Sequence, residues 1–307
     1  MSYVIRTEGL ARWYGEVVGL SDLTVKIEPG ITGLVGPNGA GKSTFMKCIV
    51  GEIRAHRGRL EVLGLSPFAN KELYRRLGFC PQQDALYDHM SGREFVEHLL
   101  RLSGTPRREA RARAIRSMER VGLADTMDRR CNGYSKGMRQ RVRLAQAIAH
   151  EPELLIVDEP LTGLDPVVRH RMVDLFLELR NEGRSILVSS HVLHEVEALT
   201  ERIVLIHRGR LLAQGKLAEI RDLLSSQPRR IRLPAASPRP LAQRIMGLPG
   251  VSSVQIDEQE TAVSVTTRNL PGLNQALPSI VGELRPGITA FESHDEDLEA
   301  VFDYLVG

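Results

Sequence analysis

A single nine-residue stretch, Gly36–Thr44, constrains this chain more than any other part of its sequence. Its letters, GPNGAGKST, match the pattern G-x-x-x-x-G-K-[ST] at every fixed position. The apolar run Ile31–Val35 comes directly before it and predicts a buried strand, and the residues after Ser43 can form a helix. A glycine-rich turn between a strand and a helix N-terminus presents backbone N–H groups and a partial positive charge to an anion. The stretch therefore predicts a phosphate-binding loop in an α/β protein.

The side chains of this loop suit a nucleotide that carries a metal ion. Lys42 would reach the β- and γ-phosphates, and the Ser43 hydroxyl would ligate Mg²⁺. The glycines let the backbone curl so that its N–H groups point inward. The expected nucleotide contacts of the loop are those of Gly36, Asn38, Gly39, Ala40, Gly41, Lys42, Ser43 and Thr44.

Composition argues against a disulfide-bonded secreted protein, a cysteine metal site and a membrane-spanning chain. The chain has 307 residues, enough for two domains. Its three cysteines are odd in number and have no metal-ligand spacing, which favours a reduced cytosolic protein. We find neither an N-terminal signal segment nor an apolar run of about 18 residues, so we expect a chain that does not itself cross a membrane.

Charge gives little reason to expect nucleic acid as a partner. The net charge is only +3. Arginines cluster between Arg107 and Arg116, but Glu109 and Glu119 interleave with them and no aromatic residues accompany them. This pattern favours a solvated helix face over a nucleic-acid interface.

Polar residues follow two further apolar runs. Leu154–Val157 predicts a buried strand that ends in Asp158 and Glu159, and Ser185–Ser189 predicts another that ends close to His191. Open parallel sheets bind ligands at the carboxyl ends of their strands. Asp158 could hold Mg²⁺ directly or through water, and Glu159 could orient or deprotonate an attacking water. His191 by itself stays open between a structural and a catalytic role.

Three more segments carry weaker signals. Gln82 follows a predicted strand, where its amide could bond water or Mg²⁺ or simply belong to a polar loop. Ser135 is a good N-cap for the next predicted helix, so Ser135 and Gly137 lie where a phosphate is favoured. Trp13 and Tyr14 precede a turn, and either ring could stack on a base or pack into a core.

Taken together and in this order, these segments resemble the nucleotide-binding subunit of ATP-binding cassette (ABC) transporters. The resemblance covers about residues 3 to 220. It implies that Gly36–Thr44 is the Walker A loop and that Asp158 ends the Walker B strand. By the same resemblance, the motif residues elsewhere are an adenine-stacking Tyr14, a Q-loop Gln82 that also approaches Mg²⁺, a catalytic Glu159, a D-loop Asp165 and a switch His191.

The family's signature position is occupied by Tyr134–Met138. This segment departs from the common Leu-Ser-Gly-Gly-Gln and keeps only Ser135 and Gly137. Its Tyr-Ser-Lys-Gly-Met form is similar to that of the branch that serves ABC-2 type exporters of drugs, antibiotics and polysaccharides. The departure leaves open how Lys136 and Met138 alter the grip on the γ-phosphate.

The resemblance implies a fold and a mechanism. We expect an α/β P-loop NTPase, the ABC cassette, over residues 1–226, with an antiparallel β-subdomain and a helical subdomain near 84–150. Two copies would close head to tail, so that each ATP lies between the Walker A loop of one and Ser135 of the other. This homodimer would power a separate integral membrane permease from the cytoplasmic face of the cell membrane. The alternative is a soluble ABC ATPase acting on the ribosome or nucleic acid, but such proteins usually carry two cassettes or a long coiled coil.

The remaining residues, 227–307, predict a small C-terminal α+β domain. From Ile231 onward the strand and helix patterns follow the order βαββαβα, close to a ferredoxin-like arrangement. The last strand is expected over Ile288–Phe291 and the last helix over Leu298–Leu305. Mixed charge without a candidate ligand cluster predicts a module used for contact, similar to extensions of ABC-2 exporter ATPases.

Overall fold

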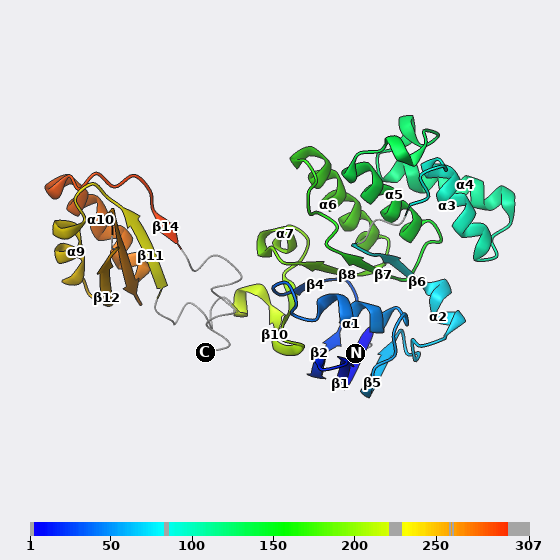
Figure 1. The fold of residues 1–307 in the computed structure, drawn as a ribbon, viewed down its shortest axis with the longest axis horizontal. Coiled ribbons are helices and arrows are strands. Elements are labelled where there is room, and N and C mark those ends of the chain that lie inside the picture. Colours follow the sequence, from blue (N-terminus) through cyan, green and yellow to red (C-terminus); the bar gives the residue numbers. More distant parts are fainter. Residues whose placement is uncertain (1–2, 83–85, 221–228, 258, 260, 294–307) are drawn as a thin grey trace. The chain divides into compact units, whose positions relative to one another are not determined.

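The chain divides into two compact units, residues 1–216 and 217–307 (Figure 1). The structure is a computed structural model, and it describes residues 3–82, 86–220, 229–257, 259 and 261–293. The domain boundary expected between residues 226 and 227 lies outside the described residues. None of the helices in the described segments is long and apolar enough to cross a lipid bilayer.

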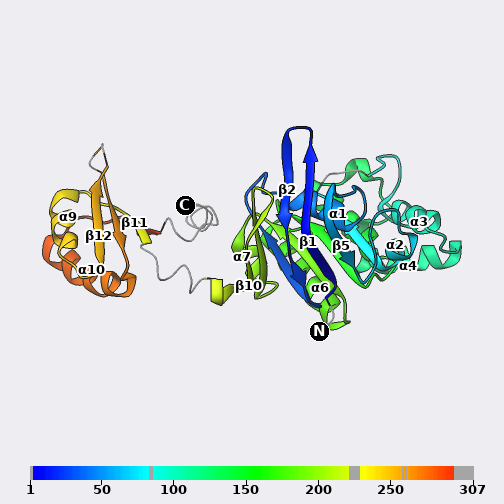
Figure 2. The ribbon, with the colours of Figure 1, turned by 90° about the horizontal axis from the view of Figure 1, so that it is seen from below.

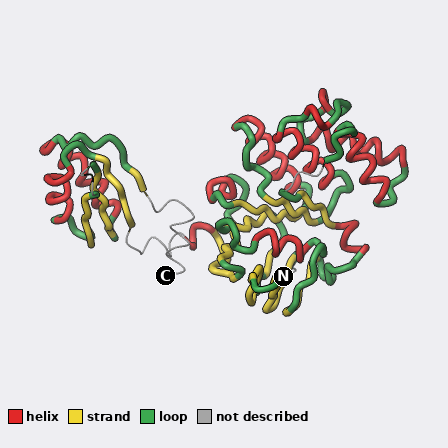
Figure 3. The backbone as a smooth tube through the Cα atoms, in the orientation of Figure 1, coloured by secondary structure: helices red, strands yellow, loops and turns green. Residues whose placement is uncertain are grey.

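A six-stranded sheet forms the centre of the first unit. Its strand order is β10-β9-β4-β8-β7-β6, and every neighbouring pair is parallel except β9 with β10. Every residue of β4, β7 and β8 is buried, because helices lie on both faces of the sheet (Figure 3). The strands are β4 (Ile31–Val35), β6 (Leu77–Cys80), β7 (Leu154–Asp158), β8 (Ser185–Ser190), β9 (Arg202–His207) and β10 (Arg210–Lys216).

The predicted antiparallel subdomain is confirmed as a second sheet. Strand β1 pairs with β2, β3 and β5, and β1 and β2 form the long hairpin drawn in dark blue in Figure 2. Its apolar residues share one core with helix α1 (Lys42–Ile49), which supplies Phe45 and Met46. The strands are β1 (Ile5–Tyr14), β2 (Val17–Leu23), β3 (Lys26–Ile27) and β5 (Arg57–Val62).

Helices on the other face of the central sheet share a separate core. Phe95 of α3, Met118 of α4, Val142 of α5 and Phe176 of α6 belong to this one cluster. Helix α3 begins with the expected capping box, in which Ser91 and Glu94 satisfy each other's backbone N–H groups. The helices are α2 (Lys71–Arg76), α3 (Gly92–Leu102), α4 (Arg107–Arg120), α5 (Lys136–Ile148), α6 (Pro166–Asn181) and α7 (Leu193–Glu197).

The second unit has the order βαββαβ within the described residues, as predicted, with an antiparallel sheet ordered β12-β13-β11-β14. The expected last strand over Ile288–Phe291 is wrong. Pro286 and Gly287 accept hydrogen bonds from the loop after β11, and Ile288 forms only an isolated bridge with Ala235. The ladder with β11 forms at Glu292–Ser293. The helix expected over Leu298–Leu305 lies outside the described residues. The elements are β11 (Arg229–Pro234), α9 (Pro238–Met246), β12 (Val251–Ile256), β13 (Ala262–Thr267), α10 (Leu270–Leu284) and β14 (Glu292–Ser293).

Candidate active site

The loop Gly36–Thr44 joins β4 to α1, as the sequence predicts. Two of its glycines have backbone angles that residues with a side chain rarely adopt, with φ of 79° at Gly39 and 106° at Gly41. A Cβ atom at Gly41 would lie 2.5 Å from the carbonyl oxygen of Gly19, whereas one at Gly39 would meet nothing within 4 Å. The loop therefore curls tightly against β2 at Gly41 and is open at Gly39, where a phosphate can approach the backbone.

Lys42 holds its ammonium group over this loop. The side chain is 6% exposed, and its Nζ atom donates to the carbonyl oxygens of Gly36 at 2.6 Å and Pro37 at 3.1 Å. Burial lowers the pKa of Lys42, while the nearby carboxylates of Glu159 and Asp158 oppose that shift. A cation held by carbonyl oxygens in this position can exchange them for phosphate oxygens.

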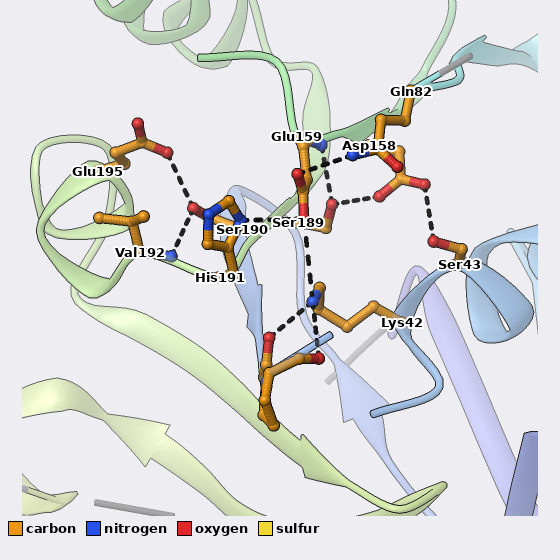
Figure 4. A network of polar contacts seen from close by, with 12 residues as sticks. Lys42, Ser43, Gln82, Asp158, Glu159, Ser189, Ser190, His191, Val192 and Glu195 are labelled. Atoms are coloured by element: carbon orange, nitrogen blue, oxygen red, sulfur yellow. Dashed lines mark hydrogen bonds and ion pairs between the residues drawn. The ribbon is translucent and has the colours of Figure 1, made fainter. Parts of the chain in front are cut away.

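Asp158 ends β7 and is held by two hydroxyl groups (Figure 4). Ser43 Oγ donates to Asp158 Oδ2 at 3.0 Å, and Ser189 Oγ donates to Oδ1. In the described part of the chain, no three His, Cys, Asp or Glu side chains gather where they could hold a metal ion. This donor set suits Mg²⁺, which proteins usually bind through one or two carboxylates together with substrate phosphates.

Glu159 is the point where the candidate residues meet. Its side chain is 7% exposed, and Gln82 Nε2 donates to its Oε2 atom at 2.9 Å. His191 Nδ1 lies 3.1 Å from Oε1, and Lys42 Nζ lies 4.0 Å from the same oxygen (Figure 4). The ends of β6, β7 and β8 and the start of α1 thus bring together residues that the sequence separates by up to 149 positions, from Lys42 to His191. A buried carboxylate with fixed partners can orient a water and accept its proton.

The two aromatic candidates have different surroundings. Tyr14 is 44% exposed, and a Cβ atom at Gly19 would lie 3.0 Å from both the Tyr14 ring and the Thr44 methyl group. Tyr14 is therefore close to the end of the phosphate loop. Trp13 instead stacks on His56, with ring centroids 5.5 Å apart. This placement favours Tyr14 over Trp13 as a surface for a base.

Ser135 and Asp165 each begin a helix. Ser135 Oγ accepts from the backbone N–H of Met138 at 3.3 Å at the start of α5, and Asp165 Oδ1 accepts from Val168 at 2.9 Å at the start of α6. Across the residues that the structure describes, no hydrogen bond or ion pair joins either side chain to the group around Glu159. Gly137 lies in the first turn of α5 with Ser135 and packs towards Leu164.

Sequence reasoning missed the hydroxyl groups that support the site. Besides its bond to Asp158, Ser189 Oγ accepts from the backbone N–H of Glu159 at 2.9 Å. Ser190 Oγ donates to the buried carboxylate of Glu195 at 2.9 Å and fixes the start of the loop that carries His191 (Figure 4). Two serines at the carboxyl end of a buried strand were a usable signal. Glu195 gave no such signal, because only the folded loop brings its carboxylate to the Ser190 hydroxyl.

The chain is similar to known proteins in sequence and in fold. Residues 20–162 match the family model described as ABC transporter. The daunorubicin/doxorubicin resistance ATP-binding protein DrrA of Streptomyces peucetius is 33% identical over 99% of this chain and 92% of its own length. A solved ATP-binding subunit of an ABC transporter is 29% identical, with a TM-score of 0.65 over 72% of this chain and 93% of that one. The dimeric structure of MJ0796, a bacterial ABC transporter cassette, is 25% identical, with a TM-score of 0.64 over 69% and 98%. This chain belongs to the ATP-binding subunits of ABC transporters, which are P-loop ATPases.

Proposed function

We propose that this chain is the ATP-hydrolysing subunit of an ABC-2 type exporter and that it drives a separate membrane permease. The observation that carries the hydrolytic part is the buried Glu159 carboxylate, which Gln82 and His191 hold beside Lys42 on the phosphate loop. Similarity to DrrA, a drug-resistance protein, over nearly the whole chain supports the exporter branch. Such a subunit would work on the cytoplasmic face of the membrane.

We expect residues of the phosphate loop, of β7 and of β1 to bind the nucleotide. Lys42 would give up its bonds to the carbonyls of Gly36 and Pro37 and bind the β- and γ-phosphates. Ser43 and Asp158 would hold Mg²⁺, which neutralises phosphate charge when bound. The adenine would stack on the exposed ring of Tyr14.

Glu159 would act on the water that attacks the γ-phosphate. The carboxylate accepts a hydrogen bond from that water, takes its proton as the new P–O bond forms, and the bond to the β,γ-bridging oxygen breaks. His191 and Gln82 each hold one carboxylate oxygen, so the base has little freedom to turn away. This division of labour separates the residues that bind ATP from those that complete the reaction.

A second copy of the chain would complete the site. Ser135 lies at an exposed helix N-terminus, which favours a phosphate, and it makes no bond to the Glu159 group among the described residues. The cassette MJ0796, which has a similar fold, was solved as a dimer. We therefore place Ser135 on the nucleotide of the partner, in a head-to-tail pair.

The test compares Lys42→Ala with Glu159→Gln. We expect Lys42→Ala to abolish ATP binding or turnover, and Glu159→Gln to bind ATP normally, stop phosphate release and accumulate as a dimer with ATP. Phosphate release, equilibrium ATP binding and sedimentation measure the three effects. Turnover by Glu159→Gln near the parent rate would show that Glu159 is not the base. Reconstitution with a permease encoded beside this chain tests the export part, because ATP turnover should then drive transport.

A further inference from the structure

One buried amide on helix α5 reaches the backbone of the candidate base, which follows strand β7. Gln140 lies in the second turn of α5 and is 8% exposed. Its Nε2 atom donates to the carbonyl oxygen of Glu159 at 3.1 Å and to that of Pro160 at 2.5 Å. Both side-chain N–H groups of one residue are thus used on two consecutive peptide groups.

The backbone that Gln140 holds is in an unfavourable conformation. Glu159 has a φ of 50°, in the left-handed region, which is unfavourable for a residue with a side chain. Such a conformation persists only where the surroundings fix it. Ser189 fixes the N–H group of Glu159, and Gln140 fixes its carbonyl group. Together they set the direction in which the Glu159 side chain leaves the backbone.

Helix α5 connects this contact to the other half of the proposed site. Its N-cap is Ser135, and Gln140 follows five residues later, about 7.5 Å along the helix axis. A helix segment of this length behaves as one rigid piece. In the proposed dimer, its first turn would face the nucleotide of the partner, while Gln140 would hold Glu159 at the nucleotide of its own subunit.

We propose that Gln140 is a positioning residue for hydrolysis, which acts by fixing the backbone of Glu159 and Pro160 from the helix that begins at Ser135. The inference rests on the proposed role of Glu159 as the base. It assigns no contact between Gln140 and ATP, so its loss should impair the chemical step and leave nucleotide binding nearly unchanged. A glutamine that served packing alone would alter stability without this kinetic separation.

The first experiment replaces Gln140 with methionine, which has a similar length and no amide. We expect kcat for ATP to fall about 10- to 100-fold, since a displacement of about 1 Å near the chemistry has an effect of that size. KM for ATP and equilibrium ATP binding should change by less than a factor of about 3, because neither depends on the direction of Glu159. Thermal unfolding of the same sample shows that the variant is folded.

A matched control tests whether the loss of any hydrogen bond from a glutamine to the backbone lowers kcat. Gln214 lies in β10 with an exposed side chain, and its amide also donates to a backbone carbonyl, that of Lys26. Gln214→Met removes the same kind of bond away from Glu159 and should keep the parent kcat. Equal losses in both variants would contradict a specific role for Gln140.

The second experiment uses Gln140→Glu and pH. An ionised carboxylate has no donor for the carbonyls of Glu159 and Pro160, whereas a protonated one has a single O–H donor. Burial raises the pKa of such a carboxyl group, so lowering the pH from 8 to 6 should restore part of the bond. The ratio of variant to parent kcat should therefore rise several-fold over this range, and a constant ratio would count against the proposal.

The two proposals fail in different ways. If Gln140→Met keeps the parent kcat while Glu159→Gln stops turnover, Glu159 is the base and Gln140 does not position it. If Glu159→Gln itself hydrolyses ATP at the parent rate, the proposed function is wrong and the inference from Gln140 falls with it. If kcat falls in both while ATP binding stays intact, both stand.

Discussion

The Nδ1 atom of His191 lies 3.1 Å from the Oε1 atom of Glu159. This contact joins the ends of two neighbouring parallel strands, because β7 leads into Glu159 and β8 into His191. Gln82 donates to the other oxygen of the same carboxylate. Each oxygen of Glu159 thus has its own partner. Replacing one partner should disturb the position of the carboxylate, and with it hydrolysis, more than it changes the affinity for ATP.

Replacing His191 tests that separation. We expect His191→Ala to lower kcat by about 100-fold or more, in line with the contribution of a group in acid–base catalysis, and to keep ATP affinity within a few-fold. Steady-state kinetics with equilibrium ATP binding measure both. His170→Ala is the control, because His170 is exposed on α6 and bonds only the carbonyl of Pro166 among the described contacts. A loss of ATP affinity that accounts for all of the effect would place His191 in binding instead.

The aromatic pair gives a second prediction. Tyr14→Ala should weaken ATP binding about tenfold, since stacking on a base contributes about 1–3 kcal/mol, and kcat should stay largely unchanged. Trp13→Ala should have little effect on ATP affinity, because the ring stacks on His56. Calorimetric titration with ATP compares the two, and the opposite ranking would reverse the assignment.

Mixed dimers test whether Ser135 acts across the pair. In the head-to-tail arrangement each site needs Lys42 from one subunit and Ser135 from the other. Mixing Ser135→Arg subunits with Lys42→Ala subunits should therefore leave at most one competent site in each mixed pair, and turnover should depend on protein concentration. If a single subunit hydrolyses ATP by itself, so that turnover per subunit does not change with protein concentration, the head-to-tail arrangement is excluded.

Buried thiols predict how stability depends on pH. Burial raises the pKa of Cys48 to about 11 and that of Cys80 to about 12. In the unfolded chain a thiol ionises near pH 8.5, so the unfolded state loses protons first and the free energy of unfolding should fall as pH rises from about 8.5 towards 12. Urea unfolding at pH 8 and pH 10 should show a smaller decline for Cys80→Ala than for the parent. Equal declines would mean that Cys80 ionises alike in both states.

Local sequence was enough to predict the loop and the buried strands. Gly36–Thr44 has a fixed pattern, and Leu154–Val157 has four large aliphatic residues that fit only an interior strand. Strand ends carry ligand-binding residues in such sheets, so Asp158 and Glu159 could be picked as candidates from their positions, whereas His191 became a catalytic candidate only through the family resemblance.

Contacts between distant segments could not be predicted in this way. The hydrogen bond from Gln82 to Glu159 joins residues 77 positions apart in the sequence. The left-handed backbone of Glu159 could not be predicted either, because glutamate rarely adopts this conformation. Gln140 reads as one polar residue in a helix until its amide is placed on two carbonyl groups of another segment. The last tail strand begins later than its apolar pattern predicts, because Ile288 forms only an isolated bridge with Ala235 and the ladder with β11 starts at Glu292.

The final prediction concerns the second unit. Among the residues that the structure describes, its buried cluster runs from Ile231 to Ile280, whereas the buried clusters of the first unit end at Ile206. Each unit therefore has a core of its own, and deleting the chain from Gln227 onward should leave the ATP-binding unit folded. ATP should bind to the truncated chain with the parent affinity.

We expect the truncated chain to lose dimer stability rather than chemistry. A self-complementary patch in the tail would hold two subunits together, and closed twofold pairs are the commonest oligomers. Turnover of the truncated chain should then be low at low protein concentration and recover as concentration rises, while the full chain changes less over the same range. ATPase rate against protein concentration measures this directly. Superimposable curves would show that the tail does not hold the pair, because mass action would then act equally on both chains.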